Sequence, residues 1–196
     1  METIKKLPVY KLRISEEDNN NLVVDYIALV DDPAIQLNWL KFDSKARFAA
    51  DKERQLVMGA FMVANMPIYR RDVQMGEYYV VFDKEEIYKI VQKFFRNNMT
   101  SNFNIMHDGV KVDGVYMIES FIIDESRGVR APETFKDLSE GSWLGTVKID
   151  NPDIWNAFIN TGELKGFSIE GLFKYEQIGE NDEAVLKEII EIVKGN

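Results

Sequence analysis

Two side chains of this sequence could form a nucleophile and its general base. His107, the single histidine, stands where the short apolar run 103–106 ends and a turn begins. Imidazole is the side chain best suited to accept and return a proton near neutral pH. Ser168 lies in the β-type run 166–175, next to glycines that would let a substrate backbone approach closely. A serine hydroxyl becomes a good nucleophile when a base takes its proton, so the two residues could serve a serine hydrolase if a tertiary contact brings their distant segments together.

A third group usually fixes the tautomer of the base, and two carboxylates are candidates for that role. Glu119 interrupts the otherwise apolar strand 115–120, where a carboxylate must be paired, solvated or functional. Glu170 follows Ser168 by two positions, and neighbours two apart on a strand are separated by ~7 Å. We therefore expect Glu119 to be the third catalytic residue, with Glu170 as the alternative.

Each of these residues also has an ordinary structural interpretation. His107 would then be a surface or capping histidine, and Ser168 would be part of a half-exposed strand. A metal hydrolase built on His107 and Asp108 is a weaker alternative, because one histidine and no cysteine leave a zinc site short of its usual ligands. The α/β-hydrolase pattern G-x-S-x-G fails, because Glu170 occupies its fifth position.

The elements that must hold these residues are mostly strands. β-type runs occur at 9–14, 22–30, 55–63, 77–82, 103–106, 115–123, 143–149 and 166–175. Helical spacing follows three caps: Asp83 with Glu86 three positions on, Asn151 followed by Pro152, and Asp182 near the C-terminus. We therefore expect an α+β fold, a mostly antiparallel β-barrel with about three surrounding helices. The barrel domain would cover residues 1–180, and a C-terminal helix residues 181–196.

The composition limits the class of protein. The chain has 196 residues, of which 45% are hydrophobic, enough for one sizeable core. A net charge of −9 repels the phosphate backbone, so we expect no nucleic-acid partner. The absence of cysteine fits a reducing cytosol, and we expect no cofactor and no metal. Neither a signal peptide nor an apolar run of ~20 residues is recognisable, so we expect no membrane association.

Three segments in a fixed order carry a family resemblance. They are NIMHDG around His107, VYMIES around Glu119, and the run EGSWLGTVKIDNPDIWNAFINTGELKGFSIEG that contains Ser168. Together with VDYIALVDDPAI and MPIYRRD further upstream, they resemble the XkdF-like phage prohead proteases, relatives of the herpesvirus assemblin class. The likeness spans roughly residues 22–173, and its most specific part is the run that leads to the serine.

The resemblance implies a β-barrel with surrounding helices and a catalytic pair, His107 and Ser168. It implies a serine endopeptidase of capsid maturation that cleaves phage scaffold protein and extensions of the major capsid protein, and often itself. The location would be the assembling prohead in the host cytoplasm, and a homodimer is compatible with this. The alternative is an inactive virion or scaffold-associated structural protein on the same fold, since fold does not fix function. The loop around Arg127 is the expected source of oxyanion donors.

Overall fold

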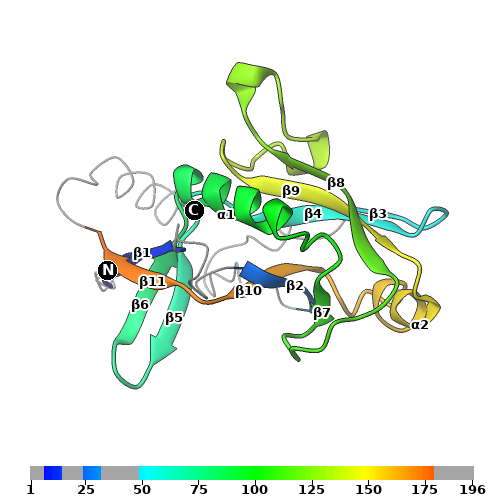
Figure 1. The fold of residues 1–196 in the computed structure, drawn as a ribbon, viewed down its shortest axis with the longest axis horizontal. Coiled ribbons are helices and arrows are strands. Elements are labelled where there is room, and N and C mark those ends of the chain that lie inside the picture. The colour runs from blue at the N-terminus through cyan, green and yellow to red at the C-terminus, as the bar shows by residue number, and fades with distance from the viewer. Residues whose placement is uncertain (1–6, 15–23, 32–48, 179–196) are drawn as a thin grey trace, which may run out of the picture.

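The strands of the described residues form three separate sheets, and Figure 1 shows how they are arranged. The computed structural model describes residues 7–14, 24–31 and 49–178. In spatial order, the first sheet contains β11 (Lys174–Gln177), β1 (Val9–Arg13), β6 (Gly76–Val81) and β5 (Ile68–Asp72). The second contains β10 (Gly166–Gly171), β2 (Val24–Val30) and β7 (Phe103–Ile105). The third contains β3 (Ala49–Asp51), β4 (Leu56–Met62), β9 (Trp143–Ile149) and β8 (Val115–Ile122).

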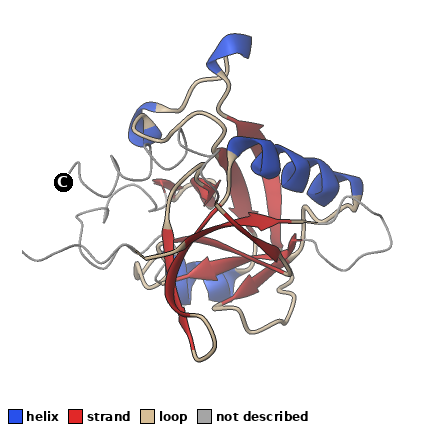
Figure 2. Cartoon of the chain, turned by 90° about the vertical axis from the view of Figure 1, so that its left-hand side faces the viewer, coloured by secondary structure: helices blue, strands red, loops and turns tan. Residues whose placement is uncertain are grey.

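The helices of the described residues lie at the periphery of the strands (Figure 2). Helix α1 (Lys84–Arg96) packs Ile87, Ile90 and Phe94 into the core. Helix α2 (Pro152–Ile154) continues as one π-helical turn, Trp155–Ile159, and two short 3₁₀ turns lie at Glu125–Arg127 and Glu133–Phe135. No helix in the described ranges is long and apolar enough to cross a membrane.

The prediction of a closed β-barrel with three surrounding helices is wrong for the part of the chain that the structure describes. Each of the three sheets ends in two edge strands, so no continuous ladder closes a barrel. The predicted single strand 166–175 is interrupted at Leu172 and Phe173, and its two halves, β10 and β11, join different sheets. The predicted third helix, after Asp182, lies outside the described residues.

The predicted cap of α1 is confirmed, and the carboxylate of Glu86 has a further role. The Asp83 side chain accepts a hydrogen bond from the Glu86 backbone N–H at 2.9 Å. The Glu86 carboxylate, 2% exposed as a side chain, accepts from the Ile14 backbone N–H at 2.6 Å and lies 3.3 Å from Arg13 Nη1. Nearby acids raise the pKa of Arg13, although burial alone would lower it. These contacts attach the start of α1 to the end of β1.

Aromatic rings fix the position of β10 over the third sheet. The ring centroid of Phe167, on β10, lies 4.6 Å from that of Phe61, on β4. Phe61 in turn lies 4.8 Å from Trp143, on β9. Each such pair contributes roughly 0.5–1.5 kcal/mol beyond area burial. Because side chains alternate along a strand, this inward-facing Phe167 directs the neighbouring Ser168 to the opposite face of the sheet.

Candidate active site

Ser168 and Asn104 lie in one row across the second sheet. Ser168 on β10 is opposite Ala28 on β2, and Ala28 is opposite Asn104 on β7. Residues paired in this way present their side chains on the same face. Because the Ala28 side chain is small, it leaves space above β2, so longer side chains of the two outer strands can reach across this strand. Glu170, two residues after Ser168, belongs to the same face.

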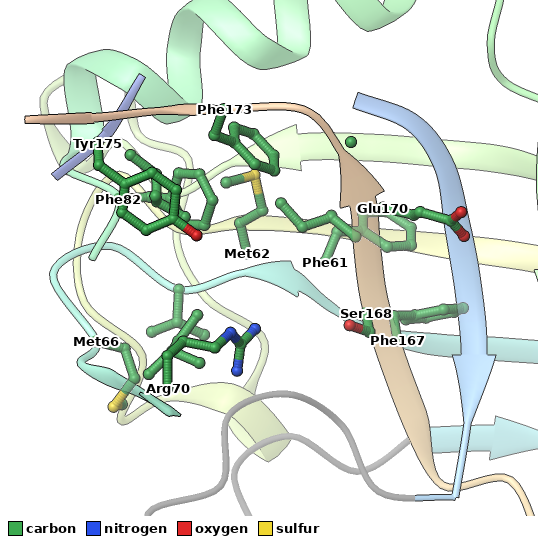
Figure 3. A pocket seen from close by; sticks show the side chains of 15 residues that line it. Phe61, Met62, Met66, Arg70, Phe82, Phe167, Ser168, Glu170, Phe173 and Tyr175 are labelled. Carbon is green, nitrogen blue, oxygen red and sulfur yellow. The ribbon is translucent and has the colours of Figure 1, made fainter. Parts of the chain in front are cut away.

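The Glu170 carboxylate joins two residues of β7 and its following turn. Asn104 Nδ2 donates a hydrogen bond of 2.7 Å to Glu170 Oε2, and His107 Nδ1 lies 3.5 Å from the same oxygen. The carboxylate extends from β10 over β2 (Figure 3), which places it within reach of the far strand. The structure therefore brings His107 together with Glu170, on the sheet face that also carries Ser168.

His107 is held in a turn with an unfavourable backbone. Met106 and His107 have φ values of 53° and 59°, and the Asp108 N–H donates to the Ile105 carbonyl at 3.1 Å. A two-residue turn with positive φ at both central positions normally contains Asn-Gly, because side chains cost roughly 1–2 kcal/mol per left-handed residue. Strain of this kind is concentrated at functional sites. Here it directs the imidazole toward Glu170.

Ser168 is reached through a pocket. Its residue surface is only 5% exposed, and its hydroxyl makes no hydrogen bond with the described residues, His107 included. It lines a pocket of about 260 Å³ together with Phe61, Arg70 and Phe173. Figure 3 shows the hydroxyl oxygen on the pocket side of β10. A substrate group in this pocket would lie next to the hydroxyl.

Glu119 lies in another sheet. It is exposed on β8, next to a register shift, and its Oε2 accepts a hydrogen bond of 2.5 Å from Thr146 Oγ1 on β9. From the sequence, a carboxylate in this strand had to be paired, solvated or functional, and the structure shows Glu119 both exposed and paired with Thr146. The described residues show no contact between Glu119 and His107.

The side chains of the turn proposed for oxyanion binding form hydrogen bonds with each other. Arg127 Nε donates to Asp124 Oδ2 at 2.6 Å, and the Ser126 hydroxyl donates to the same carboxylate. These hydrogen bonds, with that of Ser126 the largest contribution, lower the pKa of Asp124 to about 2. The turn borders a hollow beside α1 rather than the pocket of Ser168.

Two further polar residues near Glu170 were missed in the sequence. Asn104 is fully buried, and its Oδ1 has no hydrogen-bond partner within the described part of the chain. Its signal was a polar residue between Phe103 and Ile105, in a strand that is otherwise apolar. Asp25 lies one residue before the Tyr26 that pairs with Glu170. Burial raises the pKa of Asp25, and the negative charge of Glu170 raises it further.

Comparisons with protein-family models, with curated proteins and with solved structures found no match to this chain. Among the described residues, no group of three or more His, Cys, Asp or Glu side chains is arranged to hold a metal ion. Function is therefore inferred from the geometry of the side chains around Ser168.

Proposed function

We propose that this chain is a serine endopeptidase in which Ser168 is the nucleophile, His107 the general base and Glu170 the carboxylate that orients His107. The distance of 3.5 Å between His107 Nδ1 and Glu170 Oε2, on the sheet face of Ser168, is the observation that supports it most. A carboxylate beside Nδ1 keeps a proton on that nitrogen and leaves Nε2 able to accept one. Glu170 thus takes the role for which Glu119 was the sequence-based candidate.

The proposed reaction follows from these positions. Nε2 of His107 accepts the hydroxyl proton while Ser168 Oγ bonds to the scissile carbonyl carbon. The proton then passes to the departing amine as the C–N bond breaks, and water repeats the cycle to release the acid and restore the serine. The imidazole is 41% exposed as a side chain, so it has room to turn toward Ser168 when a substrate binds. Catalytic hydrogen bonds often form only in the substrate complex.

The proposed substrates come from the family resemblance. Phage scaffold protein and extensions of the major capsid protein would be cleaved inside the assembling prohead, and the chain would cleave itself as well. The first test concerns the chemistry alone.

One observation favours a second function. Because Ser168 and His107 form no hydrogen bond in the described structure, the site also fits a catalytically inactive protein that only binds its partners. Such a virion or scaffold-associated protein would keep the pocket and the sheet face and would lack an activated serine.

A fluorophosphonate probe separates the two functions, because it forms a covalent bond only with an activated serine. We expect labelling of the wild-type chain, loss of labelling in Ser168→Ala and His107→Ala, and labelling slowed at least about 10-fold in Glu170→Gln. Glu119→Gln should be labelled at the wild-type rate. Ser126→Ala, which removes an exposed serine hydroxyl, is the matched control. A folded wild-type chain that stays unlabelled would refute the endopeptidase and leave the binding function, and equal labelling of Ser168→Ala would remove Ser168 as nucleophile.

A further inference from the structure

The turn that holds His107 is attached to the second sheet through a sulfur atom. Met106 Sδ accepts the Asp31 backbone N–H at 3.5 Å, one residue after β2 ends. The Met106 N–H donates to the Leu29 carbonyl at 3.0 Å, so Met106 contacts the end of β2 through both its backbone and its side chain. His107 is the next residue, and both have left-handed φ values. The position of the imidazole therefore depends on how Met106 is held.

Met106 is also accessible to small oxidants. It is 50% exposed, more than any other methionine of the described residues. Peroxides convert a thioether to a sulfoxide, which is polar and can be reduced again by sulfoxide reductases. In this step a lone pair of Met106 Sδ attacks one oxygen of hydrogen peroxide, and the O–O bond breaks as the S–O bond forms. The other oxygen leaves as water with both hydrogens, so the sulfur loses two electrons and the peroxide gains them.

The added oxygen does not fit the present contact. An N–H···O hydrogen bond needs ~2.7–3.2 Å between nitrogen and oxygen, and the sulfur itself lies only 3.5 Å from the Asp31 nitrogen. An oxygen that takes over the Asp31 N–H must push the sulfur back, and an oxygen that turns to solvent withdraws the sulfur from the N–H. In both cases the Met106 side chain moves relative to β2, and the short turn that carries His107 moves with it.

We infer that Met106 is a site of reversible oxidation, and that its sulfoxide moves His107 away from Glu170 and slows the chemistry at Ser168. The effect on the reaction is a regulation of the proposed serine site and rests on the proposed function. The displacement of the imidazole needs no reaction, so it can be measured in a chain that cannot react. His107 is the single histidine, and its imidazole therefore gives one unambiguous set of NMR signals.

The displacement is tested in the full-length Ser168→Ala chain, with peptide mass mapping to show that Met106 carries one added oxygen. After hydrogen peroxide, we expect the imidazole chemical shifts near neutral pH to move toward those of Ser168→Ala with Glu170→Gln. Sulfoxide reductases for both epimers should return them. Imidazole signals that stay in place with Met106 fully oxidised, or that move away from those of the glutamine variant, would overturn the inference.

Two leucine substitutions assign the effect to one sulfur. Met106→Leu should make the imidazole signals insensitive to peroxide, because leucine has a similar volume and no sulfur to oxidise. Met75→Leu is the matched control, since Met75 is 40% exposed and lies in the turn between β5 and β6. It should respond to peroxide like the parent chain. An equal response in Met106→Leu would assign the effect to another methionine and overturn the inference.

The fluorophosphonate probe measures the effect on the reaction. Oxidation should slow the labelling of wild type about 10-fold, because the base is misplaced. Met106→Leu should be labelled within about 3-fold of the wild-type rate and should lose the sensitivity to peroxide. Glu170→Gln should be slowed less than about 2-fold further by oxidation, since its contact with His107 is already removed. A wild-type chain that is never labelled would refute the proposed reaction, whereas labelling that is unchanged by oxidation of Met106 would refute the regulation alone.

Discussion

Replacement of Asn104 by leucine should separate stability from activity at this site. Asn104 is fully buried, with one polar atom bonded to Glu170 and the other without a partner in the described structure. An unpaired buried acceptor costs about 1–3 kcal/mol, which leucine recovers. A hydrogen bond to a charged group contributes about 1.5–3 kcal/mol, but the Glu170 side chain is 35% exposed, so water replaces part of the loss. We expect the free energy of unfolding to stay within about 1 kcal/mol of wild type.

The activity should fall much more than the stability. Without the Asn104 donor, the Glu170 carboxylate is held only by its contact with His107, and both side chains gain freedom to turn. A misplacement of about 1 Å in a catalytic group can cost about 100-fold in rate. We therefore expect kcat/KM, or the second-order rate of probe labelling, to fall roughly 10- to 100-fold.

Urea unfolding and the labelling rate measure the two quantities on the same sample. Asn102→Leu is the matched control, because Asn102 donates to the Asp25 carbonyl and does not contact Glu170. It should lower stability and leave the labelling rate of folded molecules unchanged. If Asn104→Leu loses more than about 2 kcal/mol of stability while labelling at the wild-type rate, Asn104 is a structural residue and the positioning role is refuted.

Three further substitutions test separate parts of the structure. His107→Gly should abolish activity, but its melting temperature should be higher than that of His107→Ala. Glycine removes the left-handed backbone strain of roughly 1–2 kcal/mol. It loses only about 0.5–1 kcal/mol of this gain through the greater backbone entropy of the unfolded chain. Asp25→Asn should stabilise the chain near pH 7 and not near pH 3. Burial and the charge of Glu170 raise the pKa of Asp25, so its ionised form is less stable in the folded chain than in the unfolded one. The ionised form is present only at higher pH, so asparagine removes this cost only there. Urea midpoints at the two pH values check this, and an equal gain at both would contradict it. Glu86→Gln should lower the free energy of unfolding by about 2–4 kcal/mol, because it removes a buried charge beside a guanidinium, while the exposed Glu85→Gln should change it by less than about 0.5 kcal/mol.

The helices were predictable because their signals are local. Asp83 accepts from the backbone three residues on, and Asn151 accepts from Asp153 and Ile154, as the cap residues and the proline at 152 indicated. Each contact depends on neighbours in the chain, whose geometry is set by the helix itself. The destination of the Glu86 carboxylate was not predictable, since Arg13 and Ile14 lie more than seventy positions away.

The sheets were harder to predict because strand order depends on distant pairing. The runs at 24–30 and 103–105 have strand patterns, but neither pattern shows that the two strands pair in parallel. Neither shows that the other edge of β2 pairs with β10. The predicted barrel assumed that successive strands continue one ladder. In the structure the chain leaves the second sheet after Gly171 and enters the first at Lys174, so the ladder is divided at that point.

The sequence-based choice between the two carboxylates rested on their distance from Ser168. Ser168 and Glu170 are two positions apart on one strand, and a spacing of ~7 Å argues against direct contact between them. In a triad, however, the acid contacts the base and not the nucleophile. His107 comes from the turn after β7, two strands away, and the Glu170 side chain extends over β2 to meet it (Figure 3). In the proposed triad, an acid on the same strand as the serine therefore suits the role, because it has to reach the imidazole and not the hydroxyl.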